Sequence, residues 1–222
     1  MNSLKSTINE ILKAKEQTDS ILCSYSGGKD SLITLDLCMK NFKTVKCFFM
    51  YLVQGLECTE NALDYARRRW GVEILQYPHW GLWRSMKDEV FCQRPASMDT
   101  IEELTLKDIY SFVRHDTGIE WIATGAKKSD SMWRRRNFYL TRNWANILHP
   151  VKEWNKFDVM GYLKLNNIPV PDSSNRNATG VDLSTPSLLW LYDTYPDDFK
   201  KLLKIFPFAE TVVKRREYYG IQ

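Results

Sequence analysis

Hydrophobic residues in the first 125 positions follow two alternating patterns, short continuous runs and longer segments with helical spacing. The short apolar runs, which are typical of buried strands, are residues 20–25, 45–52, 73–77 and 121–124. The segments with helical spacing are residues 3–17, 31–41, 59–70 and 99–115. Strands that alternate with helices need crossover connections, which place parallel strands in one sheet. The pattern therefore predicts an α/β fold with a parallel twisted sheet and helices on both faces.

The pattern changes beyond Pro150, where helical segments follow one another without apolar runs between them. Residues 155–166, 184–194 and 196–218 have helical spacing, whereas residues 172–182 are polar and predict a loop. We expect residues 1–150 to form an α/β domain and residues 151–222 to form a C-terminal helical extension packed on it.

The loop after the first predicted strand has a composition that suits phosphate. Gly27 and Gly28 allow a tight turn that brings backbone amides close to a ligand. The helix that follows presents unpaired N–H groups and the positive end of its dipole. The loop also offers hydroxyl groups and a mobile cation, from Ser24, Ser26, Ser31 and Lys29. Asp30 would cap the helix or hold Mg²⁺ through water. Neither the common P-loop nor the Gly-x-Gly-x-x-Gly pattern is present.

A second loop of interest follows the fourth predicted strand and begins at Gly125. Residues 127–142 hold six basic residues and one acid, Asp130. Ligands of parallel sheets bind beyond the carboxyl ends of the strands, so we expect both loops to line one cleft. Lys127, Lys128 and Arg134 would neutralise phosphate or sulfate there, and arginine can do so with a bidentate fork.

These two loops carry a resemblance to a known superfamily. The segment Ser26-Gly27-Gly28-Lys29-Asp30-Ser31 resembles the PP-loop of adenine-nucleotide α-hydrolase-like proteins. The second loop is similar to the Gly-x-Arg-x-x-x-Ser-x-x-Arg segment of the phosphoadenylyl-sulfate (PAPS) reductase branch. Lys127 takes the place of the first Arg, and Ser131 and Arg134 match. The segment from His149-Pro150 to Trp154 and Asp158 also resembles this branch, so the likeness covers about residues 20–180.

The resemblance implies that residues 1–150 bind an adenine nucleotide, either ATP with Mg²⁺ or PAPS. It implies catalytic roles for Lys29, Asp30 (which would also hold Mg²⁺) and Arg134. The nucleotide-binding residues that it implies are Ser24, Ser26, Gly27, Gly28, Lys29, Asp30, Ser31, Gly125, Lys127, Lys128, Ser131 and Arg134. Members of the superfamily activate substrates, including nucleic acids, for sulfur or nitrogen transfer. A nucleic acid and a sulfur-donor protein are therefore candidate partners.

The C-terminal end departs from the reductase pattern. PAPS reductases resemble one another in a Glu-Cys-Gly-Ile/Leu-His tail whose cysteine attacks sulfur, whereas this chain ends Tyr219-Gly220-Ile221-Gln222. A phenol cannot replace the thiolate in that step. Three hypotheses remain: an ATP pyrophosphatase or adenylyl-transfer enzyme, a sulfonucleotide reductase that uses Cys58, and a non-catalytic nucleotide-binding regulator.

Net charge, the length of the apolar runs and the cysteine spacing narrow the classes of protein to which this chain can belong. The formal charge is +4, and no apolar run approaches the roughly 20 residues that span a bilayer. We therefore expect a cytoplasmic protein without a membrane partner. The five cysteines include no Cys-x-x-Cys pair, so we expect neither zinc nor an iron–sulfur cluster. The aromatic C-terminal helices would suit a homodimer interface.

Overall fold

A parallel sheet forms the centre of the computed structural model, which describes residues 2–132, 135–136, 138, 145–171 and 181–220. Within these residues, five strands pair in the order β3-β2-β1-β4-β5, and every pairing is parallel. The strands are β1 (Ser20–Ser24), β2 (Thr44–Tyr51), β3 (Ile74–Pro78), β4 (Ile122–Thr124) and β5 (Ile147–Leu148). The predicted α/β class with a parallel sheet is confirmed.

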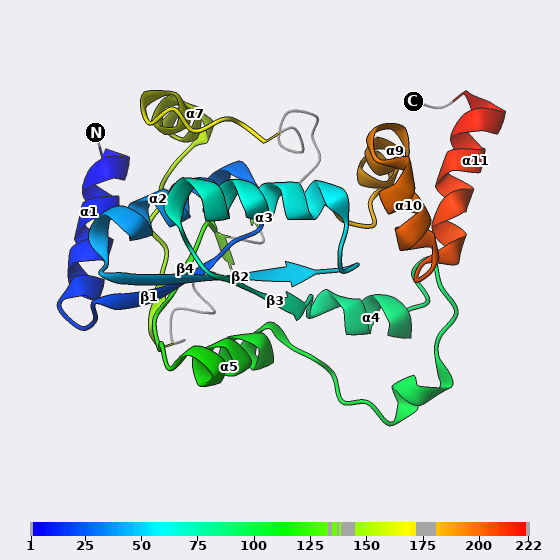
Figure 1. Ribbon diagram of the computed structural model, residues 1–222, viewed down its shortest axis with the longest axis horizontal. Helices are drawn as coiled ribbons and strands as arrows, with labels where there is room; N and C mark the ends of the chain where they lie inside the picture. Colours follow the sequence, from blue (N-terminus) through cyan, green and yellow to red (C-terminus); the bar gives the residue numbers. More distant parts are fainter. Residues whose placement is uncertain (1, 133–134, 137, 139–144, 172–180, 221–222) are drawn as a thin grey trace.

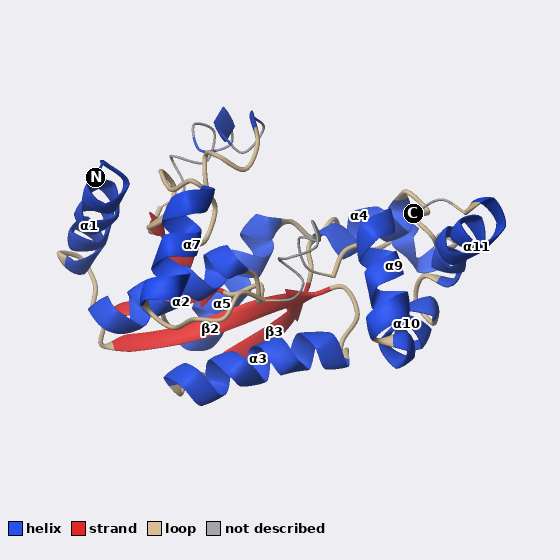
Figure 2. Ribbon diagram, turned by 90° about the horizontal axis from the view of Figure 1, so that it is seen from above, coloured by secondary structure: helices blue, strands red, loops and turns tan. Residues whose placement is uncertain are grey.

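Helices cover both faces of this sheet (Figures 1 and 2). The helices are α1 (Asn2–Lys15), α2 (Lys29–Asn41), α3 (Glu57–Trp70), α4 (Gly81–Lys87), α5 (Leu106–Thr117), α7 (Lys156–Leu165), α9 (Thr185–Thr194), α10 (Pro196–Leu203) and α11 (Glu210–Tyr219). Apolar residues of α1, α2, α3 and α7 share one core with the sheet. Residues of α5 pack on the opposite face, where Ile109 and Val113 are fully buried beside Leu22 and Ile122.

The last three helices build a separate apolar core at the end of the sheet to which β2 and β3 point (Figure 1). Leu191, Phe199 and Phe206 lie in this core and pack with Val53 and Leu56, which follow β2. The helix α7, in contrast, packs against α2 in the main core. The residues after 150 are therefore divided between two cores.

A buried carboxylate fastens the C-terminal helices to the α/β part. Asp198 of α10 accepts hydrogen bonds from the backbone N–H groups of Glu57 (2.8 Å) and Cys58 (2.9 Å). These groups begin α3, which has no side-chain cap of its own. Asp198 therefore supplies, from 140 residues away in sequence, the acceptor that a helix N-terminus requires.

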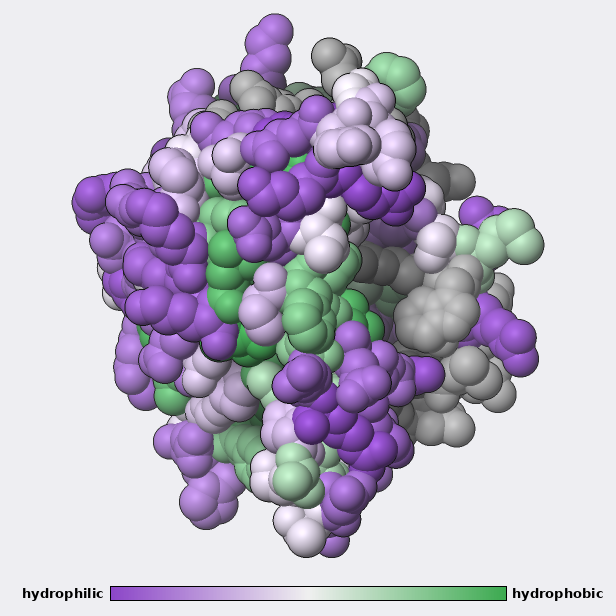
Figure 3. All heavy atoms as spheres, turned by 90° about the vertical axis from the view of Figure 1, so that its right-hand side faces the viewer, coloured by the Kyte–Doolittle hydropathy of each residue, from purple (hydrophilic) through white to green (hydrophobic). Residues whose placement is uncertain are grey.

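The surface of this end is mostly hydrophilic, with hydrophobic side chains gathered in a central band (Figure 3). The aromatic side chains of Phe208, Tyr218 and Tyr219 are 46%, 85% and 68% exposed. Their exposure is compatible with the homodimer interface predicted from the sequence, which stays a prediction.

Several predicted boundaries are wrong. The helix expected over 196–218 breaks after Leu203, and a 3-10 turn at Pro207–Ala209 precedes α11, because proline cannot continue a helical hydrogen-bond ladder. The helix expected from residue 99 begins at Leu106, where Thr105 and Asp108 form a capping box. The short elements α4 and β5 were not predicted.

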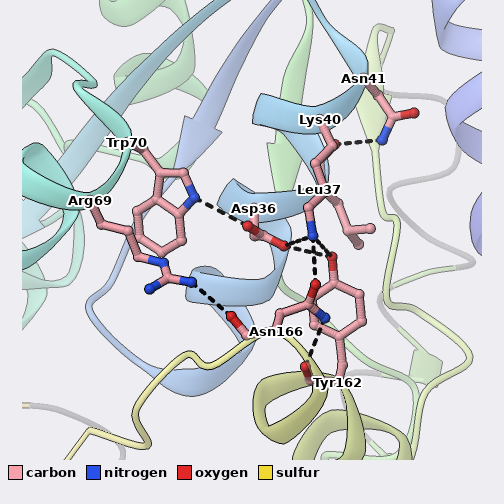
Figure 4. Close-up of polar contacts among 8 residues, drawn as sticks. All are labelled: Asp36, Leu37, Lys40, Asn41, Arg69, Trp70, Tyr162 and Asn166. Carbon is pink, nitrogen blue, oxygen red and sulfur yellow. Dashed lines mark hydrogen bonds and ion pairs between the residues drawn. The ribbon is translucent and has the colours of Figure 1, made fainter.

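A polar network joins three helices on one face of the sheet (Figure 4). Asp36 of α2, only 5% exposed, accepts hydrogen bonds from Lys40 (2.6 Å), Tyr162 of α7 (2.7 Å) and Trp70 of α3 (3.2 Å). Lys40 also donates to Asn166, just beyond α7. Both oxygens of the buried Asp36 carboxylate therefore accept hydrogen bonds, and these bonds link α2 to α3 and α7.

Candidate functional site

The two loops singled out in the sequence meet at the point where the strand order reverses. The central strand β1 has β2 on one side and β4 on the other, and Ser24 pairs in register with Thr124. The loops that follow these strands therefore leave the sheet side by side. In open parallel sheets, this switch point is where ligands bind.

The conformation of the first loop depends on two glycines. Gly27 has φ +73°, and a Cβ atom there would lie 3.1 Å from the Cβ of Ala62 in α3. Gly28 is the N-cap of α2, and the first backbone bond of this helix runs from Leu32 N–H to Gly28 O. The preceding N–H groups of the first turn make no bond within the helix, so they can receive an anion.

Side chains of Ser31 and neighbouring residues stabilise this loop through hydrogen bonds. The Ser31 hydroxyl donates to Gly28 O (2.8 Å) and lies 3.2 Å from the Ser26 hydroxyl. Asp30 does not cap the helix, because the N-cap makes no side-chain hydrogen bond. The side chain of Lys29 is 31% exposed at the helix N-terminus, with its ammonium 3.9 Å from Asp30 Oδ2.

Asp30 is held by the second loop. Its Oδ2 forms an ion pair with Lys127, whose side chain is 5% exposed, and Lys127 also lies 3.1 Å from Asp130. The other oxygen, Oδ1, is buried and has no hydrogen-bond partner among the described residues. An unsatisfied carboxylate oxygen beside a phosphate-type loop fits a Mg²⁺ ion or one of its waters.

The close approach of the two loops depends on a second glycine. A Cβ atom on Gly125 would lie 2.9 Å from the carbonyl carbon of Asp30 and 3.0 Å from the amide nitrogen of Ser31. Any side chain there would press on backbone that cannot move aside. Gly125 is therefore needed for packing the loops together, whereas its predicted role in nucleotide binding stays a prediction.

Other predicted residues of the second loop are placed less centrally. Lys128 forms an ion pair with Glu153, and its N–H bonds Lys152 O. Ser131 is exposed, as are Arg135 and Arg136. Arg134, which was expected to act in catalysis, and Arg142 lie outside the described residues.

The segment after β5, which resembles the reductase branch, stabilises the surroundings of the two loops. Trp154 is 4% exposed and donates from Nε1 to Thr7 in α1 (2.7 Å), and Asp158 belongs to the capping box of α7. His149 lies 2.8 Å from the Thr124 hydroxyl through Nδ1. Burial, aided by Lys152, lowers the pKa of His149 to about 4, so this imidazole is neutral at pH 7.

A cavity of about 430 Å³ opens beside the first loop, at Ser26 and Gly27. Its walls are mostly apolar and aromatic, with contributions from Phe49, Tyr65 and, from α9, Trp190. Among the described residues that line it there is no Arg or Lys, and the one carboxylate is that of Asp182. Such a space suits a planar organic group joined to an anion held at the loop.

Cys58 lines this cavity at the start of α3. Burial and the nearby Asp198 carboxylate raise the pKa of its thiol to about 12. The thiol is therefore protonated at neutral pH, which opposes a nucleophilic role. Asp198 was missed by the sequence analysis because it contacts Cys58 from 140 residues away in sequence.

Two negative findings concern the described part of the chain. No three His, Cys, Asp or Glu side chains there gather closely enough to hold a metal ion. None of the described helices has the length and apolar character needed to cross a membrane.

The sheet order, the glycine-based loop and its position before α2 define a protein of the PP-loop class. The chain belongs to the phosphoadenosine phosphosulfate reductase domain family, whose sequence model matches residues 20–172.

Individual relatives are distant. An uncharacterized protein of Methanocaldococcus jannaschii, MJ0066, is 26% identical over 184 residues, which cover 75% of this chain and 34% of that protein. The chain thus spans about a third of the length of this relative.

Two solved structures share the fold at low sequence identity. The U34-tRNA thiolase NcsA of Methanococcus maripaludis, with its [4Fe-4S] cluster, has a TM-score of 0.53 at 14% identity, covering 95% of this chain and 78% of its own. The NH3-dependent NAD synthetase of Campylobacter jejuni subsp. jejuni, in complex with nitrate, has a TM-score of 0.50 at 12% identity, covering 100% and 98%.

Proposed function

We propose that this protein binds Mg²⁺–ATP at the PP-loop and cleaves it between the α and β phosphates, activating a substrate for sulfur transfer. A nucleophilic atom of the substrate bonds to the α-phosphorus, the bridging P–O bond breaks, and pyrophosphate leaves with the bond electrons. The observation that carries the proposal is the combination, in one loop, of first-turn amides that precede the first bond within α2, the Lys29 ammonium and the unsatisfied Asp30 Oδ1.

Each group of this loop has a role in holding charge. The first-turn amides of α2 and the Lys29 ammonium would hold phosphate oxygens and stabilise the charge that grows on the leaving pyrophosphate. Asp30 would hold Mg²⁺ through Oδ1 while Lys127 fixes Oδ2. The ion, when bound, supplies charge neutralisation for the triphosphate.

The cavity beside the loop supports ATP as the nucleotide. It begins at Ser26 and Gly27, and its aromatic walls, including Phe49 and Tyr65, suit an adenine ring. A nucleotide can therefore place its phosphates on the amides of α2 and its base in the cavity.

The acceptor and the sulfur source are less directly supported. Arg135 and Arg136, which are exposed in the second loop, favour an anionic acceptor such as a nucleic acid. Because the Cys58 thiol is protonated, sulfur would come from a donor protein. The thiolase and the synthetase share only the fold with this chain, so neither identifies the acceptor.

The two alternative hypotheses find less support. A sulfonucleotide reductase would need a thiolate at the site, and the raised pKa of Cys58 opposes this. A regulator without chemistry would not need a buried, unsatisfied carboxylate oxygen beside the phosphate position.

The test measures binding and cleavage together. Calorimetry with Mg²⁺–ATP and with PAPS compares affinities, while pyrophosphate release and AMP formation from α-labelled ATP report cleavage. We expect ATP to bind more tightly, and Lys29→Ala to reduce kcat/KM by at least about 100-fold. Lys43→Ala serves as the matched control, because Lys43 pairs with Asp19 and is 81% exposed.

Two results would overturn the proposal. One is tighter binding of PAPS than of ATP; the other is ATP cleavage that survives Lys29→Ala unchanged. We expect Cys58→Ser to retain cleavage, whereas loss of PAPS-dependent sulfite release in that variant would revive the reductase hypothesis.

A further inference from the structure

The cavity beside the PP-loop has walls from both cores of the protein. Phe49 and Tyr65 line it from the core of the sheet, whereas Trp190 of α9 lines it from the C-terminal core. A further wall comes from the connection between β2 and α3 and from the first turn of α3, with lining residues Leu52, Val53, Leu56, Cys58 and Thr59. The shape of this wall depends on how the connection is held.

The helix α10 holds this connection, although the cavity lining includes no residue of α10, a helix that the structure describes in full. Asp198 accepts hydrogen bonds from the backbone N–H groups of Glu57 (2.8 Å) and Cys58 (2.9 Å). Lys201 donates to the carbonyl oxygen of Gly55 (2.8 Å) and to Asp198 Oδ1 (3.0 Å). Figures 1 and 2 show α10 beside the start of α3. One ion pair on α10 therefore fixes three consecutive parts of the backbone that leads into α3.

The Asp198 carboxylate is both buried and charged, which strengthens these bonds. Its side chain is 1% exposed. Burial opposes the charge, but the N–H groups of Cys58 and Glu57 and the Lys201 ammonium together hold the pKa of Asp198 below its ordinary value. Hydrogen bonds to a charged acceptor are about twice as strong as those between neutral groups. The start of α3 is therefore held in place before any ligand enters the cavity.

We infer that Asp198 and Lys201 are positioning residues for the nucleoside part of the substrate, and that they act through the cavity wall that they hold. The inference rests on the proposed function, since it takes the cavity as the nucleoside site. A wall that is fixed beforehand lowers the entropic cost of binding, so the pair favours the nucleoside rather than the phosphates. Both residues lie beyond residue 172, where the match to the family model ends.

Two ligands that share their phosphates test the inference. Tripolyphosphate carries three linked phosphates without adenosine, so the ratio of its dissociation constant to that of ATP, measured by calorimetry with Mg²⁺, reports what the cavity adds. We expect the wild-type protein to bind ATP at least about 10-fold more tightly than tripolyphosphate.

The variant Asp198→Asn keeps one acceptor oxygen where the carboxylate offers two. It should weaken ATP binding by about 10-fold, while tripolyphosphate binding changes by less than about 2-fold. The KM for ATP should rise in parallel, whereas kcat should stay within about 3-fold of the wild-type value. A general loss of stability would not separate the two ligands in this way.

A control and a second variant accompany this experiment. Asp197→Asn is the same substitution one residue earlier, at a side chain that is 80% exposed and paired with Lys200, so it should keep the wild-type ratio. Lys201→Met removes the bond to Gly55 from a side chain that is 44% exposed, and it should weaken ATP binding by about 3-fold. Lys201→Met decides the test if Asp198→Asn does not fold.

Three results would overturn the inference. They are near-equal binding of ATP and tripolyphosphate by the wild-type protein, an unchanged ratio in the folded variants, and a fall in kcat without a change in KM. If the wild-type protein cleaves Mg²⁺–ATP in those cases, the proposed function stands; if it binds neither ligand, both fail.

Discussion

The two loops at the switch point use lysine in opposite ways. Lys29 is 31% exposed at the N-terminus of α2, whereas Lys127 is 5% exposed and lies between Asp30 and Asp130. The first lysine can meet a ligand, and the second mainly fixes the carboxylate that the ligand's metal would meet. The comparison teaches that a basic residue near a site is assigned to binding or to positioning by its burial and partners.

The largest effect on stability should come from Lys127→Met. This change leaves two carboxylates without their buried cation, and we expect the free energy of unfolding to fall by about 3 kcal/mol. Urea denaturation measures it, and Lys29→Ala should change the same quantity by less than about 1 kcal/mol. If Lys127→Met lowers the free energy of unfolding by less than about 1 kcal/mol, the two lysines do not differ in their contribution to stability.

An intermediate effect is expected from Gly125→Ala, which tests the contact between the loops. The added methyl group would press on the backbone of Asp30 and Ser31, so we expect a loss of about 2 kcal/mol in stability and weaker Mg²⁺–ATP binding. Gly161→Ala is the matched control, because a Cβ atom there meets nothing within 4 Å. Equal behaviour of the two variants would show that the loops are not in tight contact.

The smallest effect should come from Lys128→Met, the same substitution one residue further along. Lys128 pairs with Glu153 at the surface, with side chains 32% and 37% exposed, so stability should change by less than about 1 kcal/mol. The same denaturation series measures it. A change as large as that of Lys127→Met would mean that position in the loop, not burial, determines the cost.

The sequence predicted the features that local chemistry determines. The apolar run before Gly27, the two glycines and the helix after them predicted the strand, turn and helix that the structure shows there, and the alternation of strands and helices predicted the parallel sheet. A two-residue strand such as β5 has too few positions to show a period, and α4 begins within an aromatic segment.

Contacts between distant segments lay beyond sequence reasoning. Lys127 was identified as basic, but nothing in its neighbourhood showed that Asp30 would lie across from it. The capping of α3 by Asp198 joins residues 140 positions apart, and no local pattern marks that partner. The charge of a residue can be read from the sequence, whereas its burial and counter-ion depend on the folded topology.

The anchoring of α2 by Asp36 has a consequence for the energetics of ligand capture. Hydrogen bonds from Trp70 of α3 and Tyr162 of α7 hold α2 in place, well behind the glycine loop at its N-terminus. The amides are thereby oriented before any nucleotide arrives, so association should lose little conformational entropy at this end of the site. Without this anchor, each binding event would include the entropic cost of immobilising the helix.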